Sequence, residues 1–299
     1  MTWRSWTIFV VLCAIWGIPY FLIKVALVDL SPLVVAWGRI TLAALVLVPI
    51  AARRKVLKPA LAHLAPVAAF AVAELVIPFS LIAVGEQWIS SSLAGILIAT
   101  VPLTVVVIAP LFGVREKLGA RRIAGLAIGF AGVVALLGLD TGHDAMLWAG
   151  AACMLVAVAG YAIGPLIVQR YLADVDELGA LTASLVVAAI LLLPFALWSA
   201  PSTMPSTSAV ASVAVLGLVC TALALLLYFY LINAAGAARA SVVAYINPAI
   251  AALLGVLVLH EPFGIGSILG LAMILLGSYL ATSKSPAAAK LEANSAERA

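Results

Sequence analysis

Three charged residues, Lys24, Arg39 and Glu74, lie inside long apolar stretches of the sequence. A charge in the hydrocarbon layer of a membrane is costly and by default marks a functional site. Arg39 lies about eight residues into its stretch, roughly 12 Å deep, so its side chain does not easily reach the interface. Its guanidinium could bind a substrate carboxylate through two parallel hydrogen bonds. An ion pair between helices, or contacts with backbone carbonyls, is the structural alternative.

Glu74 lies in the middle of the third apolar stretch and is the second charged candidate for the site. It could pair with Arg39 or take up a proton, because a low-dielectric environment favours the neutral form of a carboxyl group. A permanent ion pair is the alternative. Lys24 lies close to the end of the first stretch, so extension toward the interface is its default interpretation.

Aromatic residues and prolines within the same stretches complete the candidate site. Aromatic rings could stack on an aromatic or otherwise apolar solute. Prolines free backbone carbonyls, which a membrane tolerates only where they are packed in protein or line a cavity. Simple packing kinks are the alternative. The substrate-binding candidates besides Arg39 and Glu74 are Trp16, Tyr20, Trp37, Pro78, Pro102, Tyr161, Tyr228, Tyr245 and Asn247, and the candidate hinges are Pro19, Pro165 and Pro248.

The composition places these residues in a membrane protein. Hydrophobic residues make up 66% of the 299 residues, charged residues 9%, and the mean hydropathy is +1.26. Soluble domains are about 45–50% apolar and about 25% charged. The net charge of +4 comes from basic residues in short connectors, which favours orientation signals over nucleic-acid binding. The lipid bilayer is therefore an expected partner, and nucleic acid is not.

Ten apolar stretches are long enough to cross a bilayer, which requires about 20 residues each. They predict an all-α integral membrane protein with ten transmembrane helices. The stretches are Ser5–Val28, Pro32–Ala52, His63–Val84, Ser90–Phe112, Ala120–Leu137, Met146–Val168, Glu177–Ser199, Ser208–Leu231, Ala238–Leu259 and Gly264–Thr282.

The positive charges predict the orientation. Of the 16 Lys and Arg residues, all but Lys24 and Arg39 fall at the termini or in alternate connectors, and the opposite connectors receive none. By the positive-inside rule, both termini are expected in the cytoplasm. The segment 284–299 is rich in Ala, Lys, Glu and Ser and is predicted to be a disordered cytoplasmic tail.

The sequence repeats itself at an offset of 145 residues. At this offset Pro49 matches Pro194, Glu116 matches Glu261, and the glycines 125 and 132 match 270 and 277. The repeats predicted are residues 1–140 and 141–283, with five helices each. An odd number of helices inverts the second copy in the membrane, which suits alternating access around a central site. Glu116 and Glu261 lie at ends of apolar stretches, which indicates gating or capping rather than substrate contact.

Glycine spacings add a packing prediction. Gly125 and Gly129, and likewise Gly266 and Gly270, are four residues apart, as in small-residue faces where membrane helices pack closely. Packing within one monomer is the favoured interpretation, and a dimer interface is the alternative.

The segments that carry the repeat resemble the EamA-type proteins of the drug/metabolite transporter superfamily. The resemblance covers residues 5–282, and within the superfamily the chain is most similar to bacterial aromatic amino-acid exporters. The resembling segments are Ser31-Pro32, Trp37-Gly38-Arg39, Gly85 to Ser92, Pro102, Arg115 to Leu118, Gly125, Gly132, Asn247-Pro248, His260-Glu261-Pro262, Gly270 and Gly277.

The resemblance implies a ten-helix exporter of the bacterial inner membrane with a central cavity and no cofactor. The expected activity is alternating-access export of small metabolites, most of all aromatic amino acids. A drug or toxic-metabolite exporter with proton antiport through Glu74 is the alternative. The sequence has no GxxxxGK[ST] or HExxH motif, and an enzyme, a cofactor and a bound metal are not expected.

Overall fold

The computed structural model describes residues 2–114, 119–140, 144–236, 240 and 242–282, and all regular secondary structure in this part of the chain is helical. Within these described ranges, nine helical spans are long and apolar enough to cross a membrane, and Val243–Val258 is a shorter apolar helix that completes ten. The predicted all-α fold with ten membrane helices is therefore confirmed. Glu116 and the tail from 284 lie outside the described residues.

Each of the first five spans is either one long helix or a series of shorter helical segments. They are α1 (Trp3–Gly17) with α2 (Pro19–Ala26); α3 (Pro32–Arg53); α5 (Leu64–Phe70), η1 (Ala71–Val76) and α6 (Ile77–Gly85); α7 (Ser91–Ile98), α8 (Val101–Ile108) and η2 (Ala109–Phe112); and α9 (Ala120–Asp140). The short helix α4 (Leu57–Leu61) lies in the connector after α3.

The second five spans follow the same order. They are α10 (Ala145–Tyr171); α11 (Glu177–Trp198); α12 (Thr207–Gly217), η3 (Leu218–Leu223) and α13 (Ala224–Ala235); α15 (Val243–Val258); and α16 (Ile265–Thr282).

Two spans that the sequence predicts as single helices are interrupted. Pro19 begins α2 after a break at Ile18, and Pro102 lies in the first turn of α8 after a break at Ala99. A proline has no N–H to donate, so it suits the first turn of a helix, where that N–H would have no partner within the helix. The carbonyl oxygen of Ala99 accepts a hydrogen bond from Ser278, which satisfies it inside the protein.

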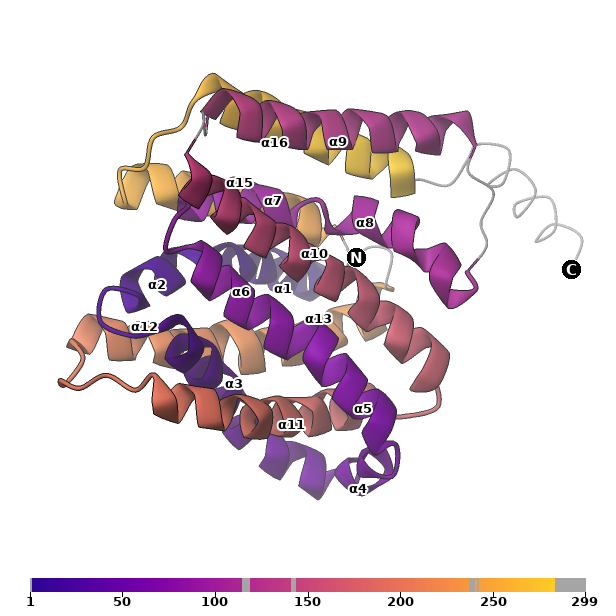
Figure 1. The fold of residues 1–299 in the computed structure, drawn as a ribbon. Helices are drawn as coiled ribbons and strands as arrows, with labels where there is room; N and C mark the ends of the chain where they lie inside the picture. The colour runs from indigo at the N-terminus through magenta and orange to yellow at the C-terminus, as the bar shows by residue number, and fades with distance from the viewer. Residues whose placement is uncertain (1, 115–118, 141–143, 237–239, 241, 283–299) are drawn as a thin grey trace, which may run out of the picture.

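Each repeat packs against the other through matching helices. Helix α3 packs against α11, α7 against α15, and α9 against α16. Figure 1 shows these pairs as successive layers, with α9 and α16 uppermost. Such pairing of counterparts is expected for two copies related by a twofold axis.

The α9–α16 pair is held by glycines that bring the two backbones together. A Cβ placed on Gly277 would lie 2.5 Å from the Gly129 nitrogen and 2.6 Å from the Gly125 carbonyl oxygen. Gly132 and Gly270 approach each other in the same way, farther along the two helices. Since rising numbers on α9 meet falling numbers on α16, the helices are antiparallel. We call these five glycines the glycine seam; they confirm close packing within the chain.

The connectors gather at two ends of the bundle. Asp29 accepts hydrogen bonds from the backbone and the hydroxyl of Ser206, and Ser31 donates to Ser199 at 2.9 Å. We call this the outer end; in Figure 1 the α11–α12 and α15–α16 connectors lie there, at the left. At the opposite end Arg170 donates to the Phe112 carbonyl at 2.8 Å. Connectors that the sequence predicts on the same side of the membrane therefore do lie together. Which of the two ends faces the cytoplasm stays a prediction.

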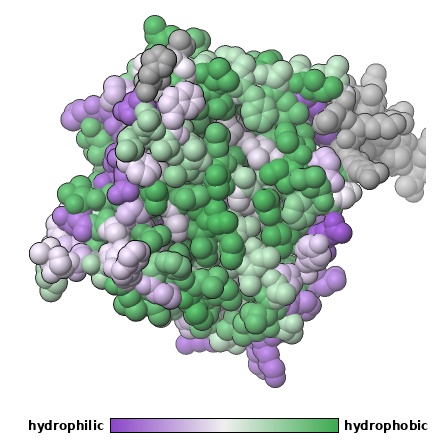
Figure 2. Space-filling model, viewed as in Figure 1, coloured by the Kyte–Doolittle hydropathy of each residue, from purple (hydrophilic) through white to green (hydrophobic). Residues whose placement is uncertain are grey.

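The surface agrees with a position in the bilayer. On the face of the molecule that Figure 2 shows, a broad hydrophobic region covers the middle, and hydrophilic residues gather along its two sides. Large side chains such as Leu45, Ile190 and Val134 are exposed, as expected for helices whose outer faces contact lipid.

Candidate functional site

Arg39 lies where the two repeats meet. It extends from α3, is only 8% exposed, and donates from Nε to the Thr221 hydroxyl, 2.8 Å away in η3 of the second repeat. Its guanidinium carbon lies 3.9 Å from the centroid of the Phe79 ring on α6. Nε is the one guanidinium nitrogen of Arg39 with a hydrogen bond to a described residue. The two Nη groups therefore have no hydrogen-bond partner among the described residues.

Aromatic side chains surround this guanidinium. Tyr161 on α10 packs edge-on against Phe79, with ring centroids 6.5 Å apart. Tyr20 on α2 and Tyr161 both lie close enough to Arg39 for its charge to act on their hydroxyl groups. The sequence predicts Arg39, Tyr20 and Tyr161 as site residues, and the structure brings these three together.

The sequence does not single out Phe79 or Thr221. Phe79 follows Pro78 directly, and Thr221 is a polar residue inside a predicted span. Those features are the available signals, but neither shows which way a side chain points. Both partners of Arg39 become evident only once α6 and η3 are placed around α3.

Two π-helical turns lie at matching places in the repeats. η1 interrupts the third span and contains Glu74, and η3 interrupts the eighth span and contains Thr221. η1 packs against α11, whereas η3 packs against α3, so each turn contacts the second helix of the other repeat. Such turns occur frequently at functional sites, and Pro78 contributes to η1 by removing one backbone donor.

Glu74 lies apart from Arg39. Its Oε2 is buried, has no hydrogen-bond partner among the described residues, and packs against Gly164 of α10. Tyr161 and Tyr228 are near enough for charge interaction with Glu74, and Arg39 is not among its partners. An Arg39–Glu74 ion pair, the alternative for both residues, is therefore absent from the described part of the structure.

A second carboxyl group, that of Glu86, lies near enough to Arg39 for charge interaction. Glu86 caps α6 and is 0% exposed, and its charge interacts with those of Lys24, Glu261 and Arg39. Burial raises the pKa of Glu86 well above its usual range; Lys24 and Arg39 oppose this effect, and Glu261 adds to it. Lys24 donates to the backbone carbonyls of Glu86 and Ile89, the second at 2.7 Å. Lys24 therefore joins α2 to the α6–α7 connector, whereas the sequence favours its extension to the interface.

Glu261 joins the second repeat to α7. Its carboxylate accepts hydrogen bonds from the backbone N–H groups of Ser91 at 2.7 Å and Ser92 at 2.9 Å, and from the Ser92 hydroxyl at 2.6 Å. Burial acts to raise the pKa of Glu261, but these hydrogen bonds outweigh it and lower the pKa. The predicted capping role of Glu261 is therefore confirmed, at the N-terminus of α7.

Trp16 and Tyr228 form an aromatic pair between α1 and α13. They extend from α1 and α13, and their ring centroids are 4.9 Å apart. The nearby charge of Glu74 acts on Tyr228. This pair therefore adjoins the Glu74 region rather than Arg39.

Trp37 faces away from Arg39. Its indole Nε1 donates to the Ala189 carbonyl at 3.1 Å, and its ring lines a cavity of about 520 Å³ between α3 and α11. Leu45 and Ile190, which also line this cavity, are exposed. Two residues along a helix turn a side chain by about 200°, which places Trp37 and Arg39 on different faces of α3.

The remaining candidates are dispersed. Tyr245 bonds to Thr282 at the end of α16, at 2.8 Å, so it lies at the end of the bundle opposite the outer end. Asn247 has a buried Oδ1 with no hydrogen-bond partner among the described residues. Pro165 and Pro248 lie within the continuous helices α10 and α15, so their predicted role as hinges is not accompanied by a helix break.

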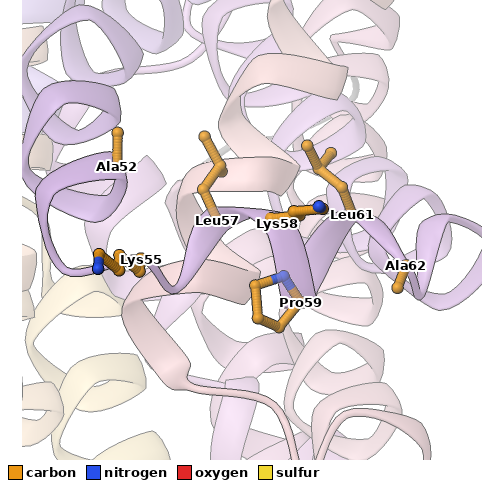
Figure 3. A pocket seen from close by; sticks show the side chains of 7 residues that line it. All are labelled: Ala52, Lys55, Leu57, Lys58, Pro59, Leu61 and Ala62. Carbon is orange, nitrogen blue, oxygen red and sulfur yellow. The ribbon is translucent and has the colours of Figure 1, made fainter.

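A larger cavity, of about 780 Å³, lies at the turn after α3. Figure 3 shows its seven lining residues, which run from the end of α3 through the turn and α4 to the residue after α4: Ala52, Lys55, Leu57, Lys58, Pro59, Leu61 and Ala62. Neither this cavity nor the one beside Trp37 includes Arg39. The described residues contain no group of three His, Cys, Asp or Glu side chains placed to hold a metal.

Comparisons with known proteins identify the family. The model of the EamA-like transporter family matches residues 4–138 and again residues 148–283. An uncharacterized transporter of Archaeoglobus fulgidus is 26% identical over 94% of this chain and 99% of its own length. The uncharacterized inner membrane transporter YedA of Escherichia coli is 28% identical, over 95% and 94%. A solved crystal structure matches with a TM-score of 0.66 and 19% identity, over 94% and 97%.

Proposed function

This chain belongs to the EamA-like transporter family and is a multi-pass membrane transporter, and we propose that it exports small metabolites by alternating access. The two family matches fall on its two halves, as the arrangement of five plus five helices requires. The proposed substrates are amino acids, the aromatic ones foremost. We place it in a bacterial inner membrane, as a monomer with both termini in the cytoplasm; YedA is called an inner membrane transporter.

The observation that carries the proposal is the set of contacts that the Arg39 guanidinium makes and leaves unmade. Its central carbon lies 3.9 Å from the centroid of the Phe79 ring, and one hydrogen bond joins the guanidinium to Thr221, which leaves both Nη groups without a described partner. That edge of the guanidinium suits two parallel hydrogen bonds to a carboxylate. The rings of Tyr20, Phe79 and Tyr161 would contact an aromatic substituent.

The position of Arg39 also suits alternation. Arg39 belongs to α3 of one half, and its hydrogen-bond partner Thr221 belongs to η3 of the other. Movement between the halves would therefore change the contact that orients the guanidinium. In the present structure Arg39 is 8% exposed, so a substrate would reach its guanidinium only when the halves separate.

Counterflow in proteoliposomes tests this proposal, with labelled phenylalanine and tryptophan. The wild-type protein should exchange both, and Arg39→Ala should abolish exchange while Arg54→Ala, an exposed arginine at the end of the same helix, should not. Arg39→Lys should retain part of the activity, since it keeps the charge and loses the paired donors. Exchange that survives in Arg39→Ala would discard the carboxylate anchor.

The second candidate function is export of drugs or toxic metabolites by proton antiport through Glu74. The buried Oε2 of Glu74, which has no hydrogen-bond partner among the residues that the structure describes, favours it. No exchange of either amino acid by folded wild-type protein, together with drug efflux that Glu74→Gln abolishes, would select this function.

A further inference from the structure

Glu86 is a buried carboxyl group that the carboxylate anchor does not use. It lies in the connector between α6 and α7, at the outer end, and is 0% exposed. Neither Oε1 nor Oε2 has a hydrogen-bond partner among the described residues. An ionised carboxylate without hydrogen bonds is strongly disfavoured in such a place, whereas a protonated one is not.

The charged groups around Glu86 are already engaged elsewhere. The ammonium of Lys24 donates to two backbone carbonyls, and the carboxylate of Glu261 accepts from the N-terminus of α7. Arg39 donates to Thr221. The titratable groups near it are the Tyr20 hydroxyl on α2 and the Cys153 thiol, whose residue contacts Gly85 from α10. None of these groups hydrogen-bonds the Glu86 carboxyl.

The enclosure identifies the ligand as a proton. Both carboxyl oxygens of Glu86 are buried and the residue is 0% exposed, so a substrate ammonium has no room beside it. A metal cation would need several oxygen ligands, but Lys24 already occupies the carbonyls of Glu86 and Ile89. A proton requires no volume beyond the carboxyl group itself.

We propose that Glu86 is a proton-binding site of the outer end, occupied while that end is closed and released to water when it opens. Once water reaches the carboxylate, ionisation becomes favourable, and Lys24 lies near enough to stabilise the charge. Closure then requires the carboxylate to take up a proton again. The coupling of this proton to a substrate rests on the proposed carrier function; the proton site itself does not.

Infrared difference spectroscopy of the purified protein between acidic and alkaline buffer tests the site directly. The wild type should show the carbonyl band of a protonated buried carboxyl group, and Glu86→Gln should lose that band. Glu177→Gln, the same change at an exposed residue, should keep it. An unchanged band in Glu86→Gln overturns the proposal.

Glu74→Gln provides a second readout that does not depend on the folding of Glu86→Gln. One protonated-carboxyl band should remain in this variant, and complete loss would assign the signal to Glu74 and overturn the proposal. In proteoliposomes Glu86→Gln should keep exchange and lose its stimulation by a pH gradient, with no dependence on sodium. Absence of exchange in the wild type would defeat the carrier function, and the infrared result would stand apart from it.

Discussion

Arg39 of the first repeat and Thr221 of the second are joined by a hydrogen bond of 2.8 Å, although 182 residues separate them in the sequence. The bond runs from α3 to the π-helical turn η3. Thr221 itself donates to the Leu216 carbonyl at 2.8 Å, so its hydroxyl is fixed to accept from Arg39. The guanidinium is therefore oriented by the half of the protein to which it does not belong.

Thr221→Val should weaken substrate binding without unfolding the protein, because it keeps the volume and removes the acceptor. A hydrogen bond to a charged group contributes about 1.5–3 kcal/mol, so KM should rise roughly tenfold or more while the maximal exchange rate changes little. Thr221→Ser, which restores the hydroxyl, should return KM close to the wild-type value. Counterflow kinetics at graded substrate concentrations measure this, and equal KM in Thr221→Val would exclude a positioning role.

Gly277→Ala should lower the stability of the bundle. Its methyl group would press on the backbone of Gly125 and Gly129, which cannot move as a side chain can. Overpacking of this kind costs about 1–3 kcal/mol, visible as a lower Tm in detergent. Gly138→Ala is the control, because a Cβ there meets nothing within 4 Å. An equal Tm in the two variants would show that the glycine seam is not tightly packed.

Gly164→Ala should disturb function more than stability, because the added methyl group meets the carboxylate end of Glu74. A side-chain end can rotate away, so the protein should fold and resemble Glu74→Gln in transport. Gly160→Ala is the contrasting variant, since its methyl group meets the Ala73 backbone carbonyl and should reduce Tm. Measuring exchange and Tm together separates the outcomes; a large loss of Tm in Gly164→Ala would mean that Glu74 cannot move.

Glu261 should make the stability of the outer end depend on pH. Its pKa is lowered in the folded protein from an ordinary value of 4.5, so its contribution is present above that value and is lost as the pH falls through the lower, folded value. Because Glu261 is partly exposed, Glu261→Gln should lower the free energy of unfolding at neutral pH by about 1 kcal/mol. The Tm at neutral pH should fall accordingly. The difference from the wild type should vanish in acid.

Melting curves over a pH series check this prediction. Glu177→Gln removes an exposed carboxylate and should leave the wild-type dependence on pH intact. A difference between Glu261→Gln and the wild type that persists below the folded pKa would point to packing rather than charge.

Much of the fold follows from composition and periodic hydrophobicity. The length of apolar stretches is set by bilayer thickness, so ten spans can be predicted without knowledge of their packing. Glycines at a repeated offset likewise indicate close helix contacts. The broken first and fourth spans are less evident, because a proline within an apolar stretch is compatible with either a kink or a new helix.

The candidate site is only partly predictable, because its contacts depend on the rotation of each helix about its axis. Trp37 and Arg39 belong to one resembling segment, yet α3 turns the indole toward Ala189 and the guanidinium toward Thr221. Glu86 belongs to a connector, where a charged residue is normally solvated. Lys24 of α2 contacts this connector, and α10 packs against the neighbouring Gly85; no local pattern encodes these contacts.

The glycine seam also identifies two helices that do not move relative to each other. Where two backbones touch without intervening side chains, sliding by a fraction of a residue would drive Cα atoms into carbonyl groups, so α9 and α16 must travel as one body. A pair of spectroscopic labels across them would report a constant separation in every conformation. A change in the separation of α3 and η3, measured while the separation of α9 and α16 stays constant, would then report rearrangement at Arg39 rather than general loosening of the bundle.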